Sequence, residues 1–243
     1  MQLRIWSHTD IGNTRSENQD CVYANAPLGL AILADGMGGH NGGEVASQRT
    51  VFGVAELLED QLAGEIADSA ALSSLIDGAI REQNRRLFGQ AQDDPRLHGM
   101  GCTLVVVVIR QGRALIANIG DSRAYLFRDG RLVQITTDHS LVQAQIDSGL
   151  ITEEEAAESN AKNMLTRAVG VAADVKPDFF EARLQPGDWL MTCSDGMLQC
   201  HRPAELQAEV AKAVRRDDPA RYLVELAVAA GSTDNVSVQV LAV

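Results

Sequence analysis

TLVVVVIRQGRALIANIGD, residues 103–121, carries the strongest evidence about the fold class. It contains two runs typical of β-strands, which meet at Gln111 and Gly112. Residues 104–109 (LVVVVI) form the longest unbroken apolar run of the chain. Because this run lacks the polar alternation of a half-exposed strand, we expect its strand to be covered on both faces of a sheet.

Strands and helices are expected in separate groups on both sides of this stretch. The expected strands are residues 3–6, 21–24, 28–34, 103–110, 114–121, 123–127, 131–136, 178–184, 189–195 and 236–243. The expected helices are 43–62, 69–90, 140–147, a short helix with the capping box Thr152 and Glu155, 203–214 and 219–230. Strands in antiparallel batches with helix pairs between them predict an α+β fold. We expect a four-layer α-β-β-α sandwich, in which two stacked, mainly antiparallel sheets are flanked by helix pairs.

The composition narrows the class of protein. The 243 residues contain no repeat and no Pro- or Ser-rich linker, so we expect one domain over residues 1–243. The 33 acidic and 21 basic side chains give a net charge of −12, which argues against binding to nucleic acid or an anionic membrane. The N-terminal residues lack the apolar core of a signal peptide, and residues 104–109 are far shorter than the roughly 18 residues of a membrane span. A cytoplasmic monomer is expected, with its four cysteines as reduced thiols rather than disulfides.

Aspartates stand at the ends of three expected strands. Asp35, Asp121 and Asp195 close strands, and Asp234 stands just before the last strand. Because the end of one antiparallel strand lies beside the start of its neighbour, these four carboxylates can meet at one sheet edge. They would repel each other unless cations neutralise them, and oxygen ligands favour magnesium or manganese. The alternative for each Asp-Gly pair is an ordinary turn, and the recurrence of the pattern favours a metal site.

Seven short motifs occur together in one order: residues 15–20 (RSENQD), 35–40 (DGMGGH), 118–123 (NIGDSR), 138–140 (DHS), 165–167 (LTR), 194–196 (SDG) and 234–235 (DN). In this order the chain resembles the metal-dependent serine/threonine protein phosphatases of type 2C, in their compact bacterial form. The resemblance spans residues 12–240. It implies the layered sandwich, one phosphatase catalytic domain over residues 1–243, and a binuclear metal site at one end of the sheets.

The resemblance also assigns the metal ligands. Two core ions, Mn²⁺ or Mg²⁺, would be held by Asp35, Asp195 and Asp234 with the Gly36 carbonyl, and Asp35 and Asp195 thereby count as catalytic. Asp20 would bind through a metal-held water. Asp121, together with Asp195, would hold a weaker third ion.

Arg15 would clamp the phosphate bidentately. His40 could protonate the seryl or threonyl leaving oxygen, and the alternative is a histidine that caps the glycine turn. We expect His139 to order the turn 138–140 rather than touch substrate. Asn235 could serve the site or only a turn.

The implied function is hydrolysis of phosphoserine and phosphothreonine in proteins by a water that two metal ions activate, opposing a bacterial serine/threonine kinase. Phosphorylated proteins would be the substrates, and a cognate kinase a further partner. Two other functions remain open, namely a binding module or pseudophosphatase and a small-molecule phosphatase. The sequence departs from the family pattern at Cys102, where threonine is usual, and at residues 159–163 (SNAKN), where His-Pro-x-Arg-Asn is common. The second departure lies in segment 141–163, which forms a flap beside the metals in relatives.

Overall fold

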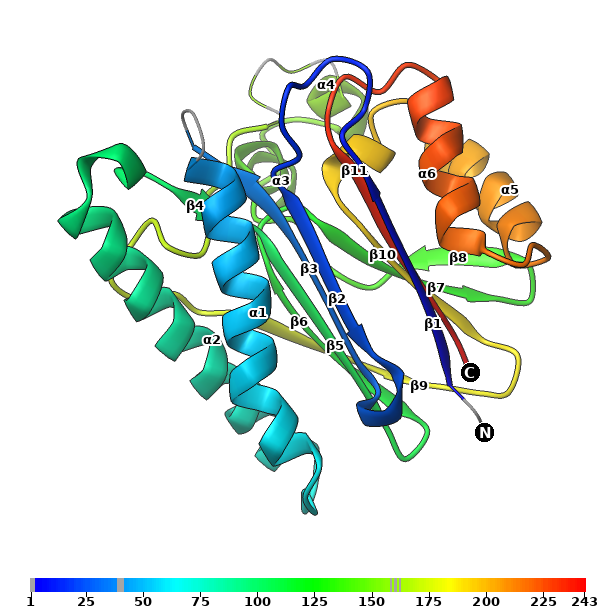
Figure 1. Cartoon of the computed structure of the whole chain (residues 1–243). Coiled ribbons are helices and arrows are strands. Elements are labelled where there is room, and N and C mark those ends of the chain that lie inside the picture. Colours follow the sequence, from blue (N-terminus) through cyan, green and yellow to red (C-terminus); the bar gives the residue numbers. More distant parts are fainter. Residues whose placement is uncertain (1–2, 39–41, 158, 160, 162) are drawn as a thin grey trace.

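Two antiparallel sheets pack face to face, and helices cover the outer face of each (Figure 1). The computed structural model describes residues 3–38, 42–157, 159, 161 and 163–243. In order across the first sheet, the strands are β1 (Arg4–Asp10), β11 (Val236–Ala242), β10 (Trp189–Cys193), β7 (Arg123–Arg128) and β8 (Arg131–Gln134). The second sheet contains β2 (Asp20–Asn25), β3 (Leu30–Met37), β5 (Leu104–Arg110), β6 (Arg113–Ile119) and β9 (Asp178–Arg183), and the short β4 (Gly101–Cys102) pairs with β3.

The helices form two outer layers. The long pair α1 (Gly42–Leu62) and α2 (Ser69–Asp93) lies on the second sheet, whereas α5 (Pro203–Ala213) and α6 (Pro219–Ala229) lie on the first (Figure 1). Two shorter helices, α3 (Leu141–Asp147) and α4 (Glu153–Ala157), occupy the expected flap segment. The predicted four-layer α-β-β-α sandwich is therefore confirmed.

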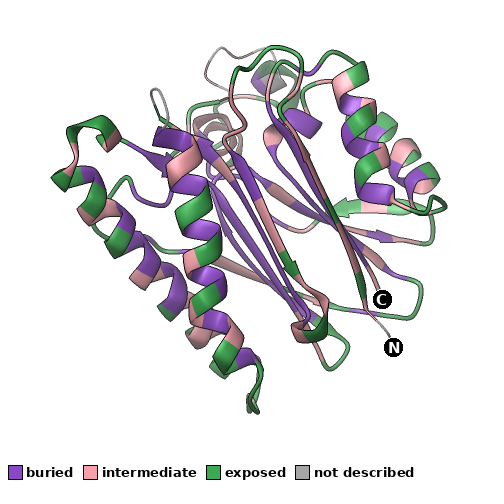
Figure 2. Cartoon of the chain, in the orientation of Figure 1, coloured by how far each residue is buried: buried purple, intermediate pink, exposed green. Residues whose placement is uncertain are grey.

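Strand β5 is covered on both faces, as its sequence predicts. Val105 and Val107 pack between the two sheets, and Leu104, Val106 and Val108 pack beneath the first helix pair. All five side chains are at most 1% exposed. Figure 2 shows the same pattern along the inner strands, where burial is nearly continuous, while the helices bury only their inward faces.

Local signals in the sequence also correspond to the observed elements. Gln111 and Gly112, and likewise Asp129 and Gly130, have positive φ angles and form the tight turns of two hairpins. Thr152 and Glu155 form the predicted capping box, with reciprocal hydrogen bonds of 2.8 and 3.2 Å. Within the described ranges, no helix has both the length and the apolar character needed to span a membrane.

The sandwich brings the ends of several strands to one end of the molecule. Asp20 opens β2 directly opposite Asp35 in β3. Strand β10 ends just before Asp195, and its partner β11 begins just after Asp234. Residues from both sheets therefore converge at this end.

Candidate metal centre

The predicted ligands gather around one cavity of about 250 Å³. Asp35, Asp121, Asp195 and Asp234 all line it, together with Gly36 and Arg15. Asp20 does not line the cavity. It is buried behind it, where its Oδ2 accepts a 2.8 Å hydrogen bond from the Ser194 hydroxyl. The structure thus brings together side chains that are up to 219 residues apart in the sequence.

Burial and mutual repulsion disfavour negative charge on these carboxylates. Burial is the main cause that raises the pKa of Asp20 to about 7, of Asp121 to about 7 and of Asp195 to about 6. Burial, followed by the charges of Asp20 and Asp195, raises the pKa of Asp35 well above its ordinary value. A cation in the cavity would reverse this balance, because it favours the ionised forms.

Two carboxylate oxygens in this group have no hydrogen-bond partner. Asp20 Oδ1 and Asp195 Oδ1 are both buried and unpaired among the described residues. Buried polar oxygens without partners are rare in folded proteins and call for a ligand, an ion or a water. These oxygens, the raised pKa values and the all-oxygen donor set fit a hard divalent cation.

The carboxylates do not form a complete coordination shell in this conformation. In the part of the chain that the structure describes, no three His, Cys, Asp or Glu side chains are placed so that they could hold an ion as they stand. Asp234 also has a partner of opposite charge, since Arg15 donates a 2.7 Å hydrogen bond to Asp234 Oδ2.

Gly36 has a packing role that its sequence position does not reveal. A Cβ at this residue would lie 2.1 Å from the Gly43 carbonyl oxygen and 2.6 Å from that of Gln19. The Gly36 amide donates to the same Gln19 oxygen at 3.0 Å. Only glycine therefore lets the first turn of α1 approach the end of β3 so closely.

Arg15 reaches the cavity from the loop between β1 and β2. Its side chain is 52% exposed, so it can exchange partners without leaving a buried charge. The hydrogen bond to Asp234 raises the pKa of the guanidinium, which stays charged. His40, the other expected catalytic group, lies outside the described residues, as do Asn160 and Lys162 of the atypical flap sequence.

Asn235, for which the sequence left two roles open, and Thr103 both support the site. Asn235 accepts a 2.8 Å hydrogen bond from the Gln19 amide and donates to the Ile11 and Glu17 carbonyls, so it fastens the loop that carries Arg15. Thr103 Oγ1 accepts a 2.9 Å hydrogen bond from the Asp35 amide. The position of Asn235 next to Asp234 suggested that it lies at the site. The sequence analysis did not identify Thr103.

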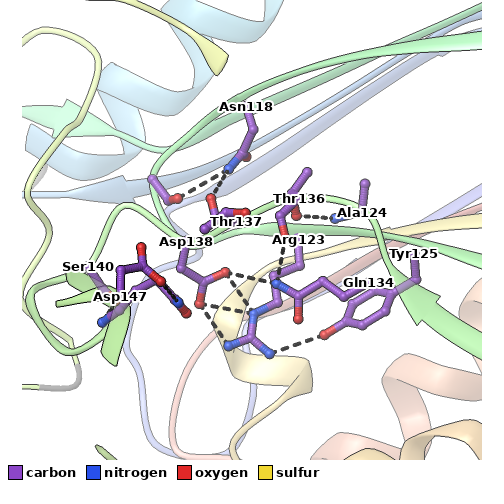
Figure 3. Close-up of polar contacts among 12 residues, drawn as sticks. Asn118, Arg123, Ala124, Tyr125, Gln134, Thr136, Thr137, Asp138, Ser140 and Asp147 are labelled. Carbon is purple, nitrogen blue, oxygen red and sulfur yellow. Dashed lines mark hydrogen bonds and ion pairs between the residues drawn. The ribbon is translucent and has the colours of Figure 1, made fainter. Parts of the chain in front are cut away.

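A polar network adjoins the cavity on the side of β7. Arg123 forms a bidentate ion pair with Asp138, with contacts of 2.7–3.0 Å, and also donates to the Tyr125 hydroxyl at 3.2 Å (Figure 3). Gln134 donates to the Thr136 carbonyl at 2.8 Å. These bonds hold the segment before α3 against the first sheet.

The four cysteines are free thiols, as expected. Cys102 is fully buried, and its Sγ lies 3.2 Å from the Thr50 hydroxyl on α1. Burial raises the pKa of this thiol to about 12. Cys102 therefore packs on the helix side of the sheet and does not line the cavity.

Comparisons with known proteins agree with this arrangement. A family model described as protein phosphatase 2C matches residues 13–229. The serine/threonine protein phosphatase PstP of Mycobacterium tuberculosis is 39% identical over 98% of this chain, which spans 44% of that relative's length. A putative protein phosphatase 2C-type of Streptococcus pyogenes is 35% identical, with 97% of this chain and 96% of the relative covered. The crystal structure of the PstP catalytic domain in complex with two manganese ions aligns with a TM-score of 0.84 at 37% identity, covering 99% of this chain and 97% of that one.

Proposed function

Since this chain belongs to the protein phosphatase 2C family, we propose that it is a metal-dependent serine/threonine protein phosphatase that hydrolyses phosphoserine and phosphothreonine in proteins. The observation that carries the proposal is the cavity in which half-buried carboxylates from both sheets face an exposed arginine. Carboxylates suit cations, and the arginine suits a phosphoryl group. A phosphate monoester needs both kinds of partner at once.

The chain offers ligands for two core ions, Mn²⁺ or Mg²⁺. Asp35, Asp195 and Asp234 would hold them with the Gly36 carbonyl, and Asp20 would act through a water. Asp121, with Asp195, would hold a weaker third ion. When bound, the core ions supply Lewis-acid activation of the attacking water and neutralise charge on the phosphoryl oxygens.

Arg15 binds the phosphate in this proposal. Its guanidinium now donates to Asp234, one of the assigned ligands, so it must exchange that carboxylate for the substrate. Phosphoryl oxygens match the planar fork of arginine. Because the Arg15 side chain is half exposed, exchanging the carboxylate for the phosphate has a low free-energy cost. Arg15 would then orient the phosphorus for in-line attack by the water.

The leaving oxygen of serine or threonine is a poor leaving group and requires a proton. We assign the donation of this proton to His40. The alternative is that His40 only caps the glycine turn, and comparing substrates with good and poor leaving groups distinguishes the two roles. A phosphothreonine peptide needs the acid far more than p-nitrophenyl phosphate does. His40→Ala should therefore lower turnover more on the peptide, and equal losses on both substrates would indicate a structural histidine.

The substrates are phosphorylated proteins, and a serine/threonine kinase must act in the same cell to supply them. Two cavity-lining residues are Asn163, which ends both the flap segment and the atypical sequence 159–163, and Leu165, which follows shortly after it. Substrate preference should depend on this segment. We further propose that the protein acts as a cytoplasmic monomer.

A substrate panel tests the proposal. Phosphoserine and phosphothreonine peptides should release phosphate in Mn²⁺ faster than a sugar phosphate or a nucleotide does, and Asp195→Asn protein prepared in parallel controls for contaminating activity. Preference for the sugar phosphate or nucleotide would indicate a small-molecule phosphatase. No turnover of any substrate by Mn²⁺-loaded protein would indicate a binding module.

A further inference from the structure

The backbone turn that carries Asp121 is held by a side chain from another segment. Gly120 has a φ of +98°, and a Cβ there would lie 2.6 Å from Thr103 Cγ2. Its amide donates to His139 Nδ1 at 3.0 Å, and its carbonyl accepts from the His139 amide at 2.9 Å. Asn118 adds a weaker 3.3 Å hydrogen bond to the same carbonyl. Both polar groups of the Gly120 backbone therefore bind His139.

The hydrogen bonds of His139 define its tautomer. Because Nδ1 accepts from the Gly120 amide, the proton of the neutral ring is on Nε2. Nε2 lies 3.0 Å from Asp178 Oδ2 and 3.1 Å from Arg167 Nη1, and only the carboxylate can accept its proton. Arg167 holds the other oxygen of that carboxylate at 2.8 Å. Asp178 thus fixes the imidazole in the form that can accept from Gly120. The ring is buried, and burial lowers the pKa of His139, which favours the neutral form.

The backbone of His139 belongs to the root of the flap segment. Its carbonyl accepts a 2.8 Å hydrogen bond from the Thr166 amide, and the Leu141 amide donates to the Met164 carbonyl at 2.8 Å. Ser140 forms a β-bridge with Leu165 between these two bonds. Residues 139–141 and 164–166, which we term the flap root, therefore join the two ends of segment 141–163.

The preceding residue anchors the flap root on its other side. Asp138 is bound by Arg123 of β7, in the bidentate pair shown in Figure 3. Segment 138–141 is thus fixed to the first sheet, while His139 reaches the Asp121 turn with both its ring and its amide. A displacement of the flap root must act on that turn through these contacts.

We propose that His139 is a positioning residue that couples the flap root to the Asp121 turn. An ion at Asp121 and the conformation of the flap then influence each other, and by linkage the influence is equal in both directions. The part that concerns the ion rests on the proposed function, which assigns the weak third ion to Asp121. The contacts themselves join residues of this chain only and can be tested without an ion.

Amide exchange in the metal-free protein tests the contact directly. His139→Asn keeps an acceptor near the position of Nδ1, whereas His139→Gln places its amide near Nε2. We expect faster exchange at Gly120 in His139→Gln and near-native exchange in His139→Asn, measured by NMR. Gln143→Ala, a control substitution on α3 within the flap, should leave exchange at Gly120 unchanged. Native exchange at Gly120 in His139→Gln would overturn the proposal.

Asp178→Ala gives an independent test if a His139 variant does not fold. This carboxylate is on the surface side of the network, 42% exposed, and its loss releases the imidazole from the required tautomer. Exchange at Gly120 should rise, and an unchanged rate would contradict the proposal.

Mn²⁺ titration by calorimetry tests the link to the ion. Loss of an outer partner that orients a ligand typically weakens metal binding by roughly 10- to 100-fold. His139→Gln should weaken the third ion by this factor and leave the two tight ions unchanged, and His139→Asn should restore the native value. Equal weakening of all three ions would overturn a specific coupling to Asp121. Absence of a third ion from the wild type would refute that assignment in the proposed function, and amide exchange would still decide the role of His139.

Discussion

Asp35 lies near the end of β3 and Asp121 just after β6, and their surroundings differ at the scale of single residues. Asp35 lies opposite Asp20 in the β2–β3 ladder, and burial, followed by the charges of Asp20 and Asp195, disfavours its ionisation. Asp121 follows a left-handed glycine that is tied to the flap root. The two carboxylates are therefore expected to serve different ions.

Substitutions by asparagine should separate these roles. Asp35→Asn and Asp195→Asn each remove a charged ligand of the core ions, so activity should nearly vanish and added Mn²⁺ should rescue little. Asp121→Asn should lower turnover and leave two tightly bound ions per chain. Calorimetric titration of each variant measures this difference, and loss of both tight ions in Asp121→Asn would make Asp121 a core ligand.

The role of Arg15, which pairs with Asp234 in the structure, can also be tested with a single substitution. If Arg15 binds the phosphate in the ground state, Arg15→Ala should raise the KM for a phosphopeptide more than it lowers kcat. Arg96→Ala is a matched control, because Arg96 is 88% exposed and pairs only with the neighbouring Asp94 among the described residues. An unchanged KM in Arg15→Ala would remove the phosphate contact from the account.

The sequence predicted the residues of the site better than their contacts. Asp35, Asp121, Asp195 and Asp234 do line one cavity, as their positions at strand ends predicted. The expectation of a single sheet edge was wrong, because β3 and β6 belong to one sheet whereas β10 and β11 belong to the other. The support by Thr103 and the reciprocal bonds between Gly120 and His139 were not predicted, because such contacts depend on three-dimensional packing rather than on local residue patterns.

At the scale of elements, local chemistry explains most of the agreement between sequence and structure. The hairpin turn at Gln111 and Gly112 and the capping box of α4 depend on neighbouring residues, and these signals identified the correct elements. Strand β1 extends to Asp10, beyond the expected residues 3–6, because its ladder with β11 continues to the pair Asp10 and Val236. Such pairing with a strand more than 220 residues away leaves no local signal.

The junction between β3 and α1 provides a prediction at this scale. Gly36→Ala should destabilise the metal-free protein by about 1–3 kcal/mol, because the new Cβ overlaps two backbone carbonyls. Gly78→Ala, in α2 with no atom within 4 Å of the new Cβ, should instead stabilise it by roughly 0.5–1 kcal/mol. Urea denaturation compares the two. A Gly36→Ala protein as stable as wild type would show that α1 does not require this close approach.

At the scale of the whole molecule, the site joins the two sheets. Asp35 belongs to β3 of one sheet, whereas Asp195 and Asp234 flank β10 and β11 of the other. The hydrogen bond from Ser194 to Asp20 also crosses between them. Ions held by this set would tie the sheets together at one end.

Metal removal should therefore weaken the entire fold. A ligand at 100 times its Kd stabilises the native state by about 2.7 kcal/mol for each site. We expect Mn²⁺ to raise the urea midpoint of the wild type and chelation to reverse the rise. Asp195→Asn should show a much smaller shift, and equal midpoints with and without Mn²⁺ in the wild type would argue against tight ions between the sheets.

The most direct measurement follows phosphate release from a phosphothreonine peptide while Mn²⁺ is returned to exhaustively chelated protein, with bound metal determined in the same samples. The account predicts no turnover without metal and activity that rises to its main plateau as two ions bind per chain. Full activity in the chelated protein would contradict it.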